Sequence, residues 1–133
     1  MNRRFAISAA VVFVVWMALD FFVHGVLLYG DYASIPNVMR PPADANTRMP
    51  LMALAYVFMA VAFTWIYLKG REDKPWLPQG VRYGVAVAFL TVIPTSLIYH
   101  VVTQVPLDLA IKQIVLGFIV IVIVGIVLAW LNR

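Results

Sequence analysis

The chain has 133 residues, of which 64% are hydrophobic and only 12% are charged, and its mean hydropathy is +0.93. A soluble globular domain exposes far more charge, so the composition indicates a membrane protein. The net charge of +4 is not a nucleic-acid footprint, because no basic run is interleaved with aromatic residues. The absence of cysteine excludes disulfides, thiolate metal sites and thiol redox chemistry.

The apolar residues fall into four stretches, each close to the roughly 20 residues that a helix needs to cross a hydrocarbon core. We therefore predict an all-α membrane protein with a single domain over the whole chain. Short connections favour antiparallel neighbours and hence an up-down-up-down four-helix transmembrane bundle. The first stretch is too long for a cleaved signal peptide and is interpreted as a retained span. The expected spans are Phe5–Tyr29, Pro50–Lys69, Val81–Val102 and Leu107–Leu131.

The distribution of lysine and arginine predicts the orientation of these spans. With the N-terminus inside, seven of the ten basic residues lie on the inner side and three on the outer side. We expect both termini in the cytoplasm, and the protein in the cytoplasmic membrane of a bacterium or archaeon. The inner set is Arg3, Arg4, Lys69, Arg71, Lys74, Arg82 and Arg133, and the outer set is Arg40, Arg48 and Lys112.

Small residues at helical spacing predict the faces on which the spans pack. Packing within one protomer is the favoured interpretation, and homo-oligomer contacts are the alternative. These residues are Ala53 and Ala60 on the second span, Gly84 and Ala88 on the third, and Gly117, Gly125 and Ala129 on the fourth.

Pro94 lies inside the third span. It removes one intrahelical hydrogen bond, so it is expected to kink this helix, with Thr91 and Thr95 able to bond freed carbonyls. A structural kink is favoured over a gating hinge.

Four ionisable side chains fall inside the predicted spans, all in the outer half: Asp20, His24, His100 and Lys112. An aspartate near the bilayer centre costs about 2.5–3.5 kcal/mol on insertion scales, so it should face the bundle interior and find a partner. Lys112, on a neighbouring helix, can reach toward Asp20. Three interpretations stay open: a structural ion pair, a proton- or ion-coupling site, or a pair that orients His24 in a ligand site.

The two histidines lie at comparable depth on the first and third spans, which are diagonal in a four-helix bundle. A diagonal of roughly 13 Å suits two imidazoles that ligate one haem b iron, or a smaller metal site completed by Asp20. Histidines that only hydrogen-bond to their neighbours are the favoured interpretation of His24 and His100.

Tyr29, Tyr32, Arg48 and Tyr99 crowd the same outer rim, and Tyr29, Arg48 and Tyr99 are the candidate pocket rim. An aromatic belt with ordinary boundary charge is the favoured interpretation. The alternative is that Arg48 and the proline-rich loop cover an outward-facing pocket for an anionic or quinone-like ligand. The chain has no glycine-rich phosphate loop, no H-E-x-x-H and no G-x-S-x-G, so no enzyme class is indicated.

The segments LDFFVHGVLLYGDY from Leu19, RMPLMALAYVFMAVAF from Arg48, GVRYGVAVAF from Gly80 and VPLDLAIK from Val105 resemble small bacterial four-span membrane proteins of uncharacterised function. The resemblance implies the architecture and no functional residue. In length and span number the chain is also similar to small multidrug-resistance transporters, where Asp20 would take the place of the acidic residue in the first span. Those proteins typically use glutamate there, and their dual-topology members lack a strong charge bias.

The sequence favours a non-catalytic membrane protein: an accessory or ligand-binding bundle with a polar site in the outer half of the membrane. The first alternative is a small proton-coupled transporter that uses Asp20, with Lys112 tuning it. The second is an electron-transfer protein with haem between His24 and His100. The expected partners are the lipid bilayer and either a larger membrane complex or further copies of the chain; no nucleic acid is expected.

Overall fold

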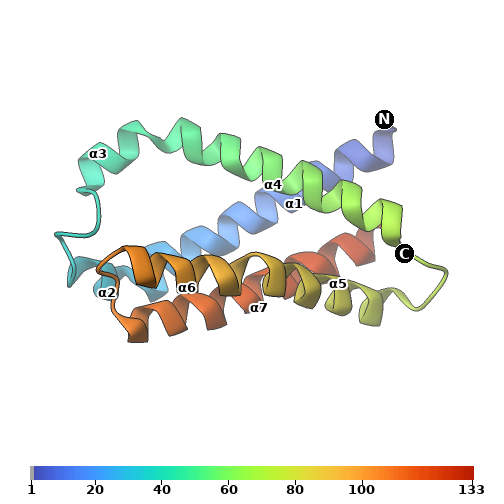
Figure 1. The fold of residues 1–133 in the computed structure, drawn as a ribbon. Helices are drawn as coiled ribbons and strands as arrows, with labels where there is room; N and C mark the ends of the chain where they lie inside the picture. The colour runs from blue at the N-terminus through green and yellow to red at the C-terminus, as the bar shows by residue number, and fades with distance from the viewer. Residues whose placement is uncertain (1) are drawn as a thin grey trace.

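The computed structural model describes residues 2–133, which form helices and no strand (Figure 1). Four helices are long and apolar enough to cross a membrane, which confirms the predicted all-α fold class. They run over Arg3–Leu27, Met49–Gly70, Trp76–Val102 and Leu107–Leu131. The third begins at Trp76 rather than at Val81, because Pro75 precedes it and Pro78 lies in its first turn, where proline is tolerated.

Shorter elements interrupt and connect these spans. The first span is α1 (Arg3–Phe22) followed by a π-helical turn, η1 (Val23–Leu27). The predicted loop between the first two spans holds α2 (Tyr29–Ala33) and α3 (Pro42–Thr47). The remaining spans are α4 (Met49–Gly70), α5 (Trp76–Leu90) with α6 (Val92–Val102), and α7 (Leu107–Leu131). We call the end with α2 and α3 the predicted outer end, and the end with the termini the predicted inner end. The direction in which each helix crosses a membrane stays a prediction.

The most extensive helix–helix contact joins α5 and α7, and glycines make it close. A Cβ atom on Gly84 would lie 2.7 Å from the Cα of Val122, and one on Gly125 would lie 2.6 Å from the carbonyl oxygen of Gly80. The two backbones therefore leave no room for a methyl group. Ala88 and Ala129 are fully buried, so the predicted packing of the small residues within one protomer is confirmed for this pair of helices.

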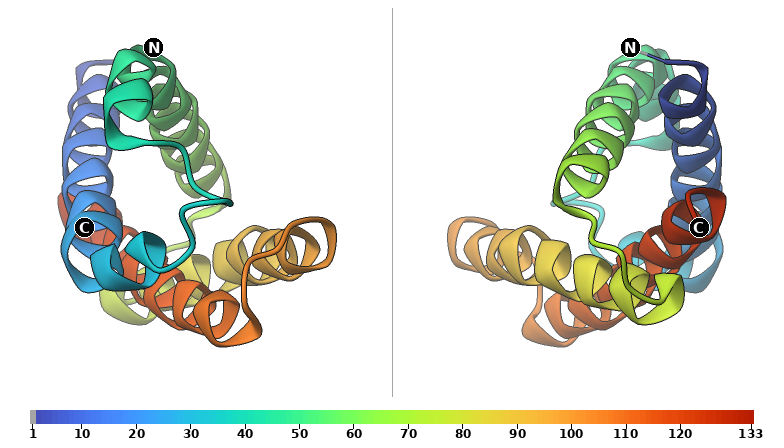
Figure 2. Two further views of the ribbon diagram at one scale, coloured as in Figure 1. Left: turned by 90° about the vertical axis from the view of Figure 1, so that its left-hand side faces the viewer. Right: turned by 90° about the vertical axis from the view of Figure 1, so that its right-hand side faces the viewer.

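Because the small face of α5 is used on α7, α4 packs elsewhere. α1 contacts α4 on one side and α7 on the other, whereas α4 makes no comparable backbone approach to α5 or α6 (Figures 1 and 2). α4 and α5 meet through side chains in the predicted inner half, where the Tyr83 hydroxyl donates to the Phe63 carbonyl oxygen at 2.6 Å. Phe63 also contacts Trp16 of α1, with ring centroids 5.1 Å apart. Aromatic side chains therefore fill the space between α1, α4 and α5 in this half of the bundle.

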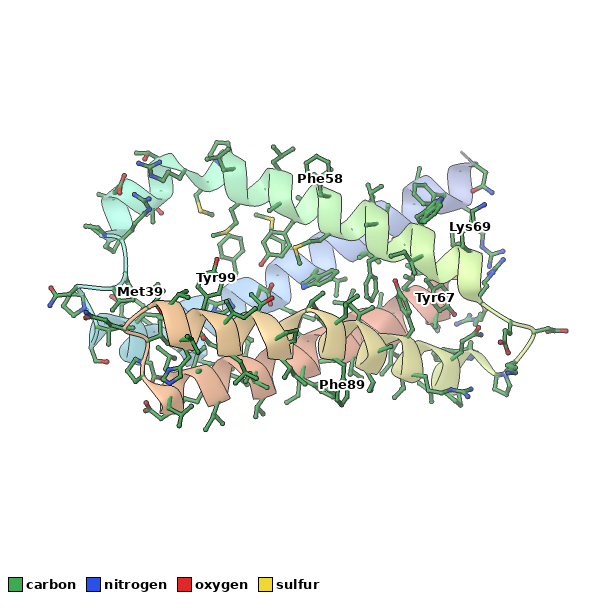
Figure 3. The ribbon with its side chains drawn as sticks, in the orientation of Figure 1. Met39, Phe58, Tyr67, Lys69, Phe89 and Tyr99 are labelled. Atoms are coloured by element: carbon green, nitrogen blue, oxygen red, sulfur yellow. The ribbon has the colours of Figure 1, made fainter. Side chains whose placement is uncertain are left out.

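The predicted outer half is open. The buried residues of α4 all lie between Ala60 and Tyr67, and none lies in its first half, residues 49–59. α6 has no buried residue. Figures 1 and 2 show α4 and α6 diverging toward the predicted outer end. In Figure 3, Tyr67 points in between the helices, whereas Phe58 points away from them.

The third span is interrupted as Pro94 predicts. The break falls at Thr91, between α5 and α6, and Pro94 lacks the N–H that would bond to the Leu90 carbonyl. The Thr91 hydroxyl donates to the Val87 carbonyl oxygen at 2.7 Å. The expected distortion is confirmed. The Val87 carbonyl also accepts the Thr91 backbone N–H at 2.9 Å, so the Thr91 hydroxyl does not replace the bond lost at Leu90.

The close α5–α7 contact predicts that one added methyl group between these helices lowers the stability of the protein. Gly84→Ala should lower the free energy of unfolding by about 1–3 kcal/mol, because the new Cβ would meet backbone atoms that cannot rotate away. Gly30→Ala is the matched control, since a Cβ there meets nothing within 4 Å. Reversible unfolding in mixed micelles measures both changes. Equal effects of the two substitutions would contradict the close backbone contact.

Candidate functional site in the predicted outer half

Asp20 lies on α1 where α1 faces α4. Its carboxylate accepts a hydrogen bond from the Tyr56 hydroxyl at 2.5 Å. Among residues 2–133, no lysine or arginine lies within ion-pair distance of Asp20. The half-buried Asp20 and Tyr56 therefore form a polar contact between two apolar helices, in the half of α4 that no other helix covers.

His24 lies one helical turn beyond Asp20, inside the π-helical turn η1. Its Nδ1 shares a hydrogen bond of 2.6 Å with the Tyr32 hydroxyl on α2. Tyr32 also accepts a hydrogen bond from the Gln113 side chain of α7 at 3.1 Å. Burial raises the pKa of the Tyr32 hydroxyl above its ordinary value, so this group is a neutral partner of His24 at physiological pH.

These side chains form two hydrogen-bonded groups: Tyr56 with Asp20, and His24 with Tyr32 and Gln113. Asp20 and His24 lie four residues apart on the first span, and no hydrogen bond joins them among the described residues. We call the five side chains together the Asp20–Tyr32 series. It draws on α4, α1, η1, α2 and α7, and it runs from inside the first span to the connection beyond that span. A π-helical turn is a frequent feature of functional sites because it re-aims side chains. Here it carries His24.

The prediction that Lys112 pairs with Asp20 is wrong. Lys112 donates to Asp31 of α2 at 2.8 Å. The reason is depth: Lys112 lies in the second turn of α7, near the predicted outer end, whereas Asp20 lies roughly 14 Å along the helix from Tyr29. Asp31 sits at the level of Lys112, and the cation satisfies the nearer carboxylate. The Lys112 side chain is about half exposed, at 49%, so this pair is a surface contact of small energy.

The two histidines belong to separate hydrogen-bonding groups. The Nδ1 of His100 hydrogen-bonds to the Val105 carbonyl oxygen at 2.7 Å, within the turn that follows α6. η1 and α6 are not among the helix pairs in extensive contact. Within residues 2–133, no group of three or more His, Asp or Glu side chains could hold a metal ion. The haem and metal hypotheses for His24 and His100 therefore gain no support from the geometry.

The three residues of the proposed rim stand apart. The side chains of Tyr29 and Tyr99 are exposed, at 65% and 57%, as an aromatic belt requires. Arg48 instead bonds to Asp44 of α3 at 3.3 Å, beside a second bond from Arg40 at 2.8 Å. The hydrogen bond from Arg40 lowers the pKa of Asp44 below its ordinary value. Arg48 is therefore part of a local ion-pair cluster centred on Asp44 of α3.

Sequence reasoning missed Tyr56 and Gln113, and it placed Tyr32 in the outer rim without predicting its hydrogen bond to His24. Tyr56 could have been found, because it lies three residues after Ala53 and four before Ala60, on the contact face that those alanines predict. Tyr32 lies outside the periodic segments, so helical spacing gives no signal for it.

No protein-family model, curated protein or solved structure matches this chain. The resemblance to small bacterial four-span proteins therefore stays a prediction, and the site stands on its own geometry.

The Tyr56–Asp20 bond predicts a stability difference between two tyrosines. Tyr56→Phe should lower the free energy of unfolding by about 1–3 kcal/mol, because it leaves the carboxyl group without its donor away from water. Tyr99→Phe is the control, because Tyr99 is exposed and should change stability by less than about 0.5 kcal/mol. In the Asp20→Asn background the cost of Tyr56→Phe should shrink; an unchanged cost would mean that the two side chains do not interact.

Proposed function

We propose that this protein is a non-catalytic membrane-embedded binding protein, whose ligand site lies in the predicted outer half between α1 and α4. Asp20 is the recognising group. The observation that carries this proposal is the environment of Asp20: a carboxylate within a span, bonded to one tyrosine hydroxyl, without a cation partner in the described chain.

The surroundings of Asp20 define the class of ligand. The first half of α4 is uncovered, with Leu51 65% and Leu54 50% exposed. A carboxylate beside apolar side chains and one tyrosine ring suits an amphipathic cation, whose charge meets Asp20 and whose apolar body meets the helices. A cationic ligand would give this carboxylate the charged partner that the described chain does not supply. Ionisable residues inside a membrane commonly mark functional sites for this reason.

The proposed orientation follows the sequence. Both termini lie in the cytoplasm, so the site opens toward the outer leaflet of the cytoplasmic membrane. An accessory role in a larger complex is compatible with this site, because a partner helix that carries a lysine or arginine presents the same chemistry.

The binding proposal is tested with tetraphenylphosphonium, a lipophilic cation, and purified protein in nanodiscs. Asp20→Asn should weaken binding about ten- to a hundredfold, the loss expected when a charged partner is removed from a site of low dielectric. Asp108→Asn is the matched control, because Asp108 is an exposed acid at the same end of the molecule. Equal affinities of the wild-type protein and the Asp20→Asn variant would end the proposal.

A second candidate, proton-coupled transport, is favoured by the Asp20–Tyr32 series. A carboxylate without a cation inside a membrane gains from taking up a proton, because an isolated buried charge costs more than a neutral acid. His24 and Tyr32, which hydrogen-bond to each other, lie between Asp20 and the connection after the span. Protons and a cationic ligand would then compete for one carboxylate.

Flux through liposomes separates the two candidates. In a transporter, an imposed pH gradient should drive accumulation of tetraphenylphosphonium by the wild-type protein, and Asp20→Asn should reduce this to the level of empty liposomes. The Asp108→Asn variant should transport normally. If tetraphenylphosphonium binding depends on Asp20 but the pH gradient drives no flux, the protein binds the cation and does not transport it.

A further inference from the structure

The predicted inner end carries a cleft unrelated to the Asp20–Tyr32 series. It lies between the start of α1 and the end of α4 and has a volume of about 600 Å³. Its lining contains three cations and, among the described residues, no acidic side chain. The lining residues are Asn2, Arg4, Phe5, Trp65, Leu68, Lys69 and Arg71.

Two of the cations contact backbone oxygens of the residues that follow α7. Arg71 donates from Nη1 to the Asn132 carbonyl oxygen at 2.8 Å, and Arg4 donates from Nη2 to the Arg133 backbone oxygen at 3.4 Å. The Asn132 side chain is itself anchored, because its Nδ2 donates to Ser8 Oγ at 3.0 Å. A guanidinium has five N–H donors, so each arginine keeps donors for a further acceptor.

The cleft is also amphipathic. Lys69 Nζ lies 5.9 Å from the centroid of the Trp65 ring, so a cation stands beside an aromatic side chain at the end of the span. Trp65 is 55% exposed and lies about one turn deeper in the membrane than Lys69. Phe5 and Leu68 continue the apolar side of the lining.

We propose that this cleft binds the headgroup of an anionic phospholipid. The phosphate accepts hydrogen bonds from Arg4, Lys69 and Arg71, and the acyl chains lie along Trp65 and Phe5. Charge complementarity gives the class of headgroup, since clusters of basic residues at the membrane boundary attract anionic lipids. The apolar wall favours a lipid over a free anion, because inorganic phosphate has nothing to place against Trp65.

Trp65 provides the assay. The full-length protein is reconstituted in phosphatidylcholine nanodiscs that contain brominated phosphatidylglycerol, a contact quencher of tryptophan, or an equal fraction of brominated phosphatidylcholine. The Trp65 signal is the fluorescence difference between each protein and its Trp65→Phe variant. The brominated anionic lipid should quench Trp65 more strongly than the zwitterionic lipid does. Equal quenching by the two lipids would overturn the proposal.

Charge variants locate the lipid. Lys69→Gln should weaken the preference for phosphatidylglycerol about fivefold, the effect expected for one basic residue at a membrane surface, and Lys69→Arg should restore it. Lys74→Gln is the control, because Lys74 lies outside this cleft and pairs with Glu72. A preference that survives Arg4→Gln/Lys69→Gln would place the lipid elsewhere and refute the site. Abolition of the preference by millimolar inorganic phosphate at constant ionic strength would reassign the cleft to a free anion.

Discussion

The contact between the α5 and α7 backbones determines how the remaining helices are arranged. Gly84 and Gly125 let the two helices approach until a Cβ atom no longer fits, and such contacts are the main source of helix association in a membrane, where lipid is as apolar as leucine. α5 has one small face, and α7 occupies it. α4 is therefore left to pack on α1, and through bulky aromatic side chains on α5.

That arrangement explains why the polar site and the opening coincide. Trp16, Phe63 and Tyr83 fill the space beside α4 in the predicted inner half, whereas no buried residue lies among residues 49–59. Tyr56 is thus the side chain whose hydrogen bond joins the open half of α4 to α1.

The sequence predicts much of the fold and less of the site. Hydropathy locates four spans, small residues locate the α5–α7 contact, and Pro94 locates the break at Thr91, because each is a local property of one helix. The partner of Lys112 could not be predicted, because it depends on where α2 folds back, and Asp31 lies in a segment without periodicity. The π-helical turn at His24 has no sequence signal that we recognise. Tyr56 was accessible to sequence reasoning through its spacing from Ala53 and Ala60.

The two ends of α4 are held by different kinds of contact, and this bears on how a ligand could act. At the predicted inner end, Arg71 is fixed to the carbonyl of Asn132, which is anchored in turn on Ser8. In the predicted outer half, the side-chain hydrogen bond from α4 to α1 ends on the carboxylate that we assign to the ligand. If Asp20 binds a cation as proposed, that cation would compete with Tyr56 for the same oxygen atoms, and protonation of Asp20 would alter the strength of this hydrogen bond. Under the proposed function, ligand binding at Asp20 would therefore be coupled to the position of the outer half of α4, whereas the hydrogen bonds at its inner end would not change.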